Sequence, residues 1–248
     1  IYTFPYTTLF RSVALVTGGV RRVGRALTLA LAGRGARVAI HHHDSGADAS
    51  TLVDELRAGG VDAAAFRADL RAADAPEQLV RDVVAHFGTI DILINSAAVM
   101  LRTPLDEVTT EVWDEMFALN LRAPFFCARA AARAMGERGG VIVNMADLAG
   151  LETWPAYAPH GISKAGVIHM TSALARILAP RVRVNAIAPG AVLLPEGWSA
   201  DDAAHLERST PLGRLGNPSD VAQTMMYLIE ADYVTGDTIV VDGGRHIR

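Results

Sequence analysis

The sequence predicts an α/β fold, with one doubly wound parallel sheet of about seven strands and helices on both of its faces. Short apolar stretches alternate with stretches of helical periodicity from residue 13 onward. Half of the 248 residues are hydrophobic, which is enough to cover two faces of a buried sheet. The first apolar stretch runs directly into a glycine-containing turn and a helical pattern. These features indicate repeated strand–helix–strand units.

The expected strands are short runs of apolar and β-branched residues. They lie at residues 13–17, 37–42, within 62–70, 90–97, 140–146, 181–189 and 237–244. The expected helices lie at residues 23–35, 49–60, 76–88, from about 124 onward, 163–178 and 219–230, with a short helical piece at 199–209. Because the series has no linker, we expect one domain over residues 13–248. The glycine- and proline-rich stretch 190–217 is expected to act as a lid.

The first twelve residues, IYTFPYTTLFRS, differ from the rest of the chain. They hold four aromatic residues in a chain that is only 6% aromatic. They lack the charged start and the small-residue cleavage site of a signal peptide. We interpret them as a non-native or disordered segment, and an edge strand or an arm between subunits is the alternative. The fold prediction therefore begins at residue 13.

Composition narrows the choice of partners. The formal net charge of −4 gives no electrostatic support for a nucleic-acid partner. The single cysteine, Cys127, excludes a disulfide within the chain and a cysteine metal cluster, as is typical of the cytoplasm. We also see no uninterrupted apolar run long enough to span a bilayer. A small-molecule ligand is the expected partner, with neither nucleic acid nor membrane.

A glycine-containing loop, TGGVRRVG at residues 17–24, separates the first strand from its helix. Glycine allows the backbone to turn tightly and to approach a pyrophosphate, whose charge then rests on the amino end of the helix. At the first strand–helix turn of such a series, this loop predicts a dinucleotide site in a Rossmann-type sheet.

These residues resemble a known family along essentially all of residues 13–248. The chain is similar to the short-chain dehydrogenases/reductases, whose loop has the form T-G-x-x-x-G-x-G. Thr17, Gly18 and Gly24 match that form, and Arg22 replaces its middle glycine. The resemblance implies an oxidoreductase that transfers a hydride between a nicotinamide cofactor and a small molecule, and a homotetramer or homodimer.

Three stretches resemble one branch of that family, the pteridine and dihydromonapterin reductases. They are the T-G-x-x-R-R-x-G loop at 17–24, HHHDS at 41–45, and VTGDTIVVDGGRHIR at 234–248. In this branch the arginine at the position of Arg22 faces the cofactor phosphates. The branch implies reduction of a dihydropterin or a dihydrofolate.

The end of the second strand selects the cofactor, because an acidic residue there binds the ribose of NAD and basic residues receive the 2′-phosphate of NADP. His42 stands at the position of the acid. Together with Arg22, the neighbouring His43 and Ser45 favour NADP(H), whereas Asp44 opposes this choice. No metal is expected from the three histidines 41–43, because successive strand residues point to opposite faces.

The resemblance implies further cofactor contacts. Asp69 is expected to hold the adenine amino group and Asn95 to support the central strand near the adenine ribose. Taken alone, Asp69 could equally be a turn residue and Asn95 a strand-end cap. The remaining implied cofactor contacts are Val23, Leu70, Ala97, Lys164, Pro189, Gly190 and Val192.

The family's catalytic residues are only partly present. A tyrosine normally donates the proton, and a lysine four residues later binds the nicotinamide ribose. Lys164 matches the lysine and Asn120 the asparagine of the proton relay, while Asp147 stands at the serine position, as in the pteridine-reductase branch. His160 stands at the position of the tyrosine. A helix-capping role for Asp147 is the alternative.

His160 is interpreted as a participating residue. Imidazolium is a competent general acid near neutral pH, and a neighbouring aspartate favours that charged form. The charge of Lys164 acts in the opposite direction. In the alternative, His160 only fills space, and Asp147 with water, or Lys164, supplies the proton.

The substrate side departs from the branch. Met100 takes the place of an aromatic residue that stacks on the pterin, and Tyr157 and Trp198 are further candidate substrate contacts, with Trp154 as another. The hypothesis is an NADPH-dependent reductase of a C=N or C=O bond, with a dihydropterin or dihydrofolate as the suggested substrate. A general carbonyl reductase or alcohol dehydrogenase, and a non-catalytic NADP(H)-binding regulatory protein, are the alternatives.

Overall fold

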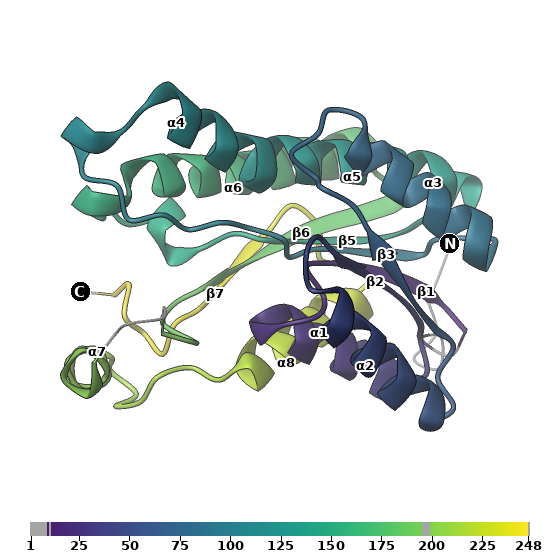
Figure 1. The fold of residues 1–248 in the computed structure, drawn as a ribbon, viewed down its shortest axis with the longest axis horizontal. Helices are drawn as coiled ribbons and strands as arrows, with labels where there is room; N and C mark the ends of the chain where they lie inside the picture. Colours follow the sequence, from purple (N-terminus) through teal and green to yellow (C-terminus); the bar gives the residue numbers. More distant parts are fainter. Residues whose placement is uncertain (1–8, 10, 195–198, 248) are drawn as a thin grey trace.

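Seven strands form one parallel sheet in the computed structural model, which describes residues 9, 11–194 and 199–247 (Figure 1). The strands are β1 (Val13–Thr17), β2 (Arg37–His42), β3 (Ala63–Arg67), β4 (Ile92–Asn95), β5 (Gly140–Met145), β6 (Val182–Pro189) and β7 (Thr238–Val241). Their order in the sheet is β3-β2-β1-β4-β5-β6-β7, and neighbouring strands pair in parallel. The predicted fold class is confirmed.

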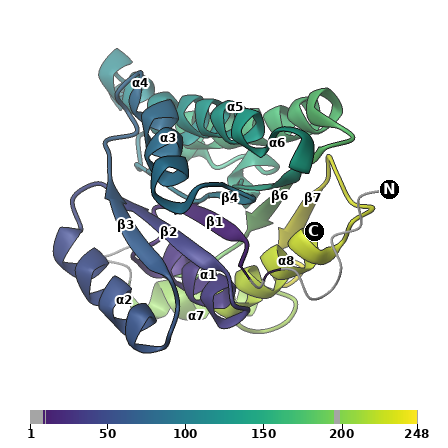
Figure 2. The same cartoon turned by 90° about the vertical axis from the view of Figure 1, so that its right-hand side faces the viewer.

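Helices cover both faces of the sheet (Figures 1 and 2). On one face lie α1 (Arg22–Gly33), α2 (Gly46–Ala58) and α8 (Pro218–Glu230). On the other lie α3 (Ala75–Phe87), α4 (Thr110–Phe117), α5 (Ala123–Met135) and α6 (Ala158–Leu178). The helix α7 (Ala200–Ser209) lies beyond the sheet, at the same end of the molecule as the C-terminal segment.

Each face of the sheet has its own apolar core. Leu27 and Ile40 belong to the core under α1, α2 and α8, and Leu79 and Leu93 belong to the core under α3, α5 and α6. β1 and β5 are buried along their whole length, which explains why both read as continuous apolar runs instead of alternating ones. The two-sided burial keeps the strand ends in fixed positions, and the loops that follow them carry the polar residues described below.

Two helices differ from the sequence prediction. α4 was not predicted, because its eight residues are too short for a clear period; it begins where the Oγ1 of Thr109 accepts a hydrogen bond from the Val112 backbone at 3.3 Å. α6 begins at Ala158 and not at residue 163, since Pro159 fits the first turn of a helix. His160 and Lys164 consequently lie on one helix, one turn apart.

Within the described residues, none of the helices is long and apolar enough to cross a membrane. The predicted segment 1–12 lies largely outside the described residues.

Candidate active site

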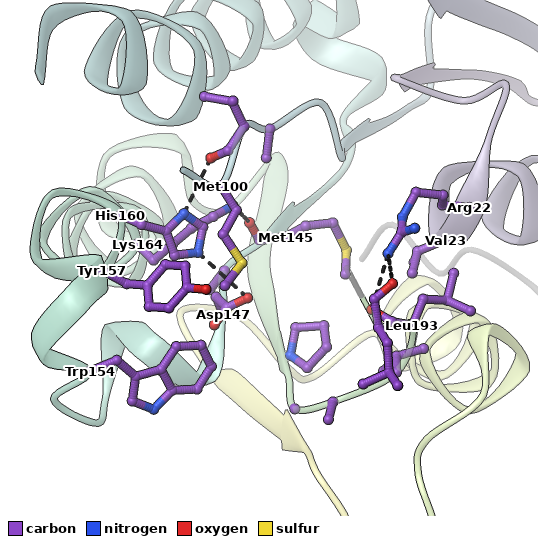
Figure 3. A pocket seen from close by; sticks show the side chains of 18 of the residues that line it. Arg22, Val23, Met100, Met145, Asp147, Trp154, Tyr157, His160, Lys164 and Leu193 are labelled. Carbon is purple, nitrogen blue, oxygen red and sulfur yellow. Dashed lines mark hydrogen bonds and ion pairs between the residues drawn. The ribbon is translucent and has the colours of Figure 1, made fainter. Parts of the chain in front are cut away.

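A cavity of about 550 Å³ opens beyond the carboxyl ends of the central strands (Figure 3). Here β1 lies next to β4, and the chain order of the strands reverses, which is where open α/β sheets bind ligands. Predicted residues that line the cavity are Arg22, Val23, Met100, Asp147, Tyr157, His160, Lys164, Pro189, Gly190 and Val192. The fold therefore gathers residues from across the sequence at one site.

The glycine loop is built so closely that it tolerates no side chain at Gly24. A Cβ on Gly24 would lie 2.0 Å from the carbonyl oxygen of Gly18, and one on Gly18 would lie 3.0 Å from the Cα of Ala97. Gly18 has a φ of +64°, in the left-handed region that favours glycine. The close packing fixes the loop directly before the amino end of α1, where a phosphate is favourably bound.

Arg22 occupies the position of the family's middle glycine and adopts a φ of +52°, which is uncommon for a residue with a side chain. Its guanidinium donates hydrogen bonds to the carbonyl oxygens of Leu193 and Leu194, at 3.0 and 3.1 Å. Arg22 thus connects the glycine loop to the segment that follows β6. The predicted lid at 190–217 falls partly outside the described residues.

His41 supports the glycine loop from behind, a role that the sequence analysis missed. The backbone N–H of Gly18 donates to its Nδ1 at 3.0 Å, and its Nε2 lies 3.1 Å from the carbonyl oxygen of Ala68. Because Nδ1 accepts, the ring is neutral and carries its proton on Nε2. Burial lowers the pKa of His41 to about 4, which keeps the ring neutral at physiological pH.

Acid should therefore destabilise the protein through His41. The folded-state pKa of about 4 lies below the ordinary histidine value of 6.5, so the unfolded chain binds the proton more tightly. The stabilising contribution is complete above pH 6.5 and is lost as the pH falls toward 4. We expect His41→Gln to remove about 3 kcal/mol of this pH dependence, measured by urea unfolding between pH 4 and 7. The exposed His43→Gln should retain it; equal slopes in both variants would contradict the assignment.

Thr17 and Asn95 join the central strands. The Oγ1 of Thr17 accepts hydrogen bonds from the backbones of Ser96 and Ala97, at 2.9 and 3.0 Å, which ties β1 to the loop after β4. The Nδ2 of Asn95 donates to the Oδ1 of Asn144 at 2.9 Å and to the carbonyl oxygen of Pro124 at 3.3 Å. Asn95 is buried, so it holds strand and helix together.

The end of β2 presents basic side chains to solvent. His42 pairs with Arg67 of β3 in the sheet register, and its Nδ1 is buried with no hydrogen-bond partner among the described residues. Burial, and next the charge of Arg67, lower the pKa of His42. His43 is exposed, and Ser45 begins α2 with its Oγ 3.3 Å from Asp44. Arg67 was not predicted from the sequence, because it lies next to His42 only through the pairing of β2 with β3.

Asp69 is held by Arg71 in the structure. The Arg71 Nε lies 2.9 Å from Oδ1, its Nη2 lies 3.1 Å from Oδ2, and its backbone N–H also donates to Oδ1 at 3.0 Å. The hydrogen-bonded guanidinium lowers the pKa of Asp69. His43 lies 3.8 Å away. The carboxylate therefore shapes this turn, while the adjacent Leu70 is buried in the apolar core.

His160 is buried with one ring nitrogen anchored and the other directed into the cavity (Figure 3). Its Nδ1 lies 3.2 Å from the carbonyl oxygen of Val99, an acceptor, and 3.5 Å from Nδ2 of Asn120, a donor; the shorter contact favours a proton on Nδ1. Its Nε2 has no hydrogen-bond partner among the described residues and lies 3.7 Å from Oδ2 of Asp147. Nε2 is therefore the nitrogen that can gain or lose a proton toward a ligand.

Asp147 caps a turn and also faces His160. Its Oδ1 accepts a hydrogen bond from the backbone of Ala149 at 2.8 Å and caps the short turn Leu148–Gly150. Its Oδ2 faces His160. The cap fixes the carboxylate in a position where it can stabilise an imidazolium.

Lys164 lies one turn after His160 and is almost completely buried. Its Nζ donates a hydrogen bond to the carbonyl oxygen of Met145 at 2.7 Å. Burial lowers the pKa of Lys164 to about 8, an effect that the nearby charge of Asp147 partly opposes. The amine is thus close to its titration range at neutral pH.

Asn120 sits in a π-helical turn, Ala118–Arg122, between α4 and α5. Its amide exchanges two hydrogen bonds with the backbone of Val99, both at 2.9 Å, and its Nδ2 donates to the Oγ of Ser163 at 3.1 Å. Ser163 in turn donates to the carbonyl oxygen of His160 at 2.7 Å. Asn120 and Ser163 therefore hold the backbones of Val99 and His160 in fixed positions relative to each other. Ser163 was not predicted from the sequence. Turns of this type frequently mark functional positions.

The candidate substrate residues lie at the end of the cavity farthest from Arg22 (Figure 3). Met100 is 40% exposed there, and the rings of Trp154 and Tyr157 pack edge to face, with centroids 6.2 Å apart. Arg245 lines the same cavity and was not predicted. Trp198 lies outside the described residues.

Comparison with known proteins identifies the family. A family model described as enoyl-(acyl-carrier-protein) reductase matches residues 19–246. A 3-oxoacyl-(acyl-carrier-protein) reductase of Staphylococcus aureus is 35% identical over 240 residues, covering 94% of this chain and 98% of that protein. The chain belongs to the short-chain dehydrogenase/reductase family. As a member of this family it is an oxidoreductase.

Solved structures of other short-chain dehydrogenases/reductases share the whole fold. The FolM alternative dihydrofolate reductase 1 of Brucella canis, complexed with NADP, matches with a TM-score of 0.93 and 31% identity, covering 98% of this chain and 96% of that one. A blue fluorescent protein from a metagenomic library, in complex with NADPH, matches with a TM-score of 0.90 and 32% identity, over 96% and 98% of the two chains.

Proposed function

We propose that this short-chain dehydrogenase/reductase is an NADPH-dependent reductase of a C=N or C=O bond, in which His160 takes the place of the usual tyrosine as proton donor. One observation carries the proposal: His160 lines the cavity, and its buried Nε2 has no hydrogen-bond partner among the described residues, 3.7 Å from Asp147 and on the same helix as Lys164. A proton donor, a carboxylate that stabilises its charged form and a cation therefore share one site.

NADP(H) is the cofactor, and the residues present fit it. The glycine loop, where a Cβ on Gly24 would collide with Gly18, leaves room for a pyrophosphate at the amino end of α1. Arg22, Arg67 and His42 place positive charge and a buried, unpartnered nitrogen near that end. Asp44 opposes a 2′-phosphate, whereas Asp69 is already engaged by Arg71. The basic residues outweigh the charge of Asp44. Two structural relatives of this chain contain NADP or NADPH.

The residues divide the chemistry as follows. NADPH, when bound, supplies the hydride, and Lys164 is placed to hold the ribose next to the nicotinamide. Val99 fixes the Nδ1 proton of His160, so the proton that reaches the substrate comes from Nε2. Asp147 stabilises the imidazolium before transfer. Asn120 and Ser163 hold the backbone at both sides of the ring.

A dihydropterin or dihydrofolate is the first candidate substrate. It is supported by the glycine loop with Arg22, by Asp147, and by the likeness to a protein named as an alternative dihydrofolate reductase. A general carbonyl substrate is the second candidate, supported by the identity to 3-oxoacyl-(acyl-carrier-protein) reductases and by Met100 in place of an aromatic residue.

NADPH oxidation separates these candidates. The purified protein is tested with dihydrobiopterin, dihydrofolate, a quinone and simple ketones, with NADH in parallel. Turnover of the pterins supports the first substrate class, and turnover of the carbonyl compounds alone supports the second. NADPH binding without turnover of any of them would contradict the reductase proposal and favour a regulatory protein.

Substitution of the ring tests His160 directly. We expect His160→Phe to lower kcat/KM with saturating NADPH by about 100-fold, because the phenylalanine ring has no proton to donate. His160→Tyr should recover part of that loss, since a phenol can donate a proton. Tyr157→Phe, which keeps the histidine, should lower kcat/KM far less than His160→Phe. Equal values of kcat/KM in the wild type and His160→Phe would rule out the histidine as donor.

We further propose that the protein assembles as a homotetramer or homodimer in the cytoplasm. Support comes from the outer surface of α4, α5 and α6, where a second cavity is lined by apolar residues such as Phe125 and Ile177, which are 39% and 72% exposed. The small residues at 128–134 allow close approach of helices. Light scattering with Ile177→Asp tests this: a smaller species is expected.

A further inference from the structure

The cavity is divided into two ends by its side chains. Arg22, Val23 and Leu193 lie on one side, next to the amino end of α1, and Trp154, Tyr157 and His160 lie on the other (Figure 3). Anions of a dinucleotide belong at the first end, where the helix terminus and Arg22 are. The second end is where a substrate would contact His160.

Arg245 lies at the second end. Its Cζ is 6.0 Å from the centroid of the Trp154 ring, and it is one of the residues lining the cavity. Trp154 in turn packs against Tyr157. A guanidinium over an aromatic face is held in a fixed plane while its remaining N–H groups stay available. Arg245 is therefore placed to meet the part of a substrate farthest from the cofactor's phosphates.

The guanidinium of Arg245 has no anionic partner within residues 9, 11–194 and 199–247. Its Nε is buried and makes no hydrogen bond there. The nearest carboxylate in the sequence, Asp242, is already engaged: Oδ1 accepts from the Gly244 backbone at 2.8 Å, and Oδ2 accepts from the backbone and Nδ1 of His246 at 2.7 and 2.8 Å. A buried donor of this kind is costly unless a ligand completes it.

The other charges of the cavity are also accounted for. Asp147 faces His160, Arg22 binds two carbonyl oxygens, and Lys164 binds the carbonyl oxygen of Met145. Among the described residues that line the cavity, Arg245 thus differs from Arg22 and Lys164 in having no hydrogen-bond or ion-pair partner for its charged group.

The C-terminal turn fixes Arg245 in this place. Gly243 and Gly244 have φ values of +67° and +88°, and the Leu212 backbone donates to the carbonyl oxygen of Gly243 at 3.1 Å. The turn is closed by Asp242, so the arginine projects from a rigid segment. Rigid placement lowers the entropic cost of binding a planar anion with two hydrogen bonds.

We propose that Arg245 recognises an anionic group, a carboxylate or a phosphate, on the substrate, at the end of the cavity opposite the cofactor's pyrophosphate. This proposal deepens the reductase function and rests on it for the identity of the ligand as substrate. It restricts the substrate to a molecule with a reducible C=N or C=O bond at one end and a negative charge at the other, with a flat or apolar portion lying along Trp154 and Tyr157.

Binding of three matched ligands tests the proposal without turnover. Isothermal titration of the full chain, saturated with NADP⁺, is made with 2-naphthoate, 2-naphthyl phosphate and the neutral 2-naphthamide. We expect the better anion to bind about tenfold more tightly than the amide, as a charge-assisted hydrogen-bonded pair would. Comparing the affinities for 2-naphthoate and 2-naphthyl phosphate then shows whether the site prefers a carboxylate or a phosphate.

Variants assign the effect to the residue. Arg245→Gln should abolish the preference for the anion and leave NADP⁺ affinity unchanged, and Arg245→Lys should keep part of it. The control is Arg102→Gln, which removes an exposed arginine that is not among the cavity-lining residues. Equal binding of anion and amide by the wild type, no binding of either anion, or a preference that survives Arg245→Gln would each overturn the proposal.

A kinetic comparison separates this proposal from the reductase proposal. With 4-oxopentanoate and its methyl ester as substrates, Arg245→Gln should raise KM about tenfold for the acid alone, with kcat retained. Equal KM changes for the two substrates would contradict a role for Arg245 in anion recognition. Absence of turnover with both substrates would count against the reductase function, while the titration would still decide the role of Arg245.

Discussion

Replacing Lys164 with methionine is expected to abolish reductase activity and, at the same time, to stabilise the cofactor-free protein. Lys164 is the only lysine of the chain, and its amine is buried against Met145. Methionine has a similar volume and carries no charge. In the proposed function Lys164 holds the ribose next to the reacting atoms, so its loss should lower kcat/KM by about 100-fold or more.

The stability change follows from the pKa of the amine. The folded-state pKa of about 8 lies below the ordinary lysine value of 10.5, so folding weakens proton binding. The cost is fully present below pH 8 and disappears as the pH rises through 10.5. It amounts to about 3 kcal/mol at neutral pH. Because Met145 loses its donor, a net gain of about 1–2 kcal/mol in the free energy of unfolding is expected for Lys164→Met.

Two measurements check this prediction. Urea unfolding at pH 7 should show a higher midpoint for Lys164→Met than for the wild type, and the difference should shrink above pH 9. Reductive ¹³C-methylation of the single lysine side chain allows its titration to be followed by NMR, where a midpoint near 8 is expected. A midpoint above 10, or a variant less stable than the wild type, would show that the ammonium is not under a burial penalty.

Replacing Gly24 with alanine is expected to remove cofactor binding. The new Cβ would lie 2.0 Å from the carbonyl oxygen of Gly18, and that atom is backbone, so the loop itself has to move. Overpacking of this kind costs about 1–3 kcal/mol. Because we propose that this loop receives the pyrophosphate, NADPH affinity should fall at least tenfold, which fluorescence titration of NADPH measures.

Gly33 provides the matched control, because it lies at the other end of the same helix and a Cβ there would meet nothing within 4 Å. Gly33→Ala should stabilise the protein by about 0.5–1 kcal/mol, since alanine favours the helix, and should leave NADPH affinity unchanged. If Gly24→Ala bound NADPH as tightly as Gly33→Ala, the pyrophosphate could not rest on this loop.

The sequence by itself determined the fold class, the place of the glycine loop and the spacing of four residues between His160 and Lys164, whereas the structure placed both residues on α6. Each of the three depends on local signals: continuous apolar runs for buried parallel strands, glycine at the first turn, and positions close together in the chain. Such signals can be recognised in the sequence alone, because the residues that form them are neighbours in the chain. The start of α6 was predicted too late, because Pro159 interrupts the helical pattern of the sequence. α4 was not predicted, because its eight residues are too few to show a helical period.

Only the tertiary structure decided how the site residues act. Val99 and His160 are 61 residues apart in the sequence, yet their contact settles which ring nitrogen faces the cavity. His41 was one of three equivalent histidines until burial beneath Gly18 made it neutral and structural. Arg245 approaches Trp154 from the far end of the chain. Protonation state, hydrogen-bond partner and burial are properties of contacts between distant segments, and folding alone brings those segments together.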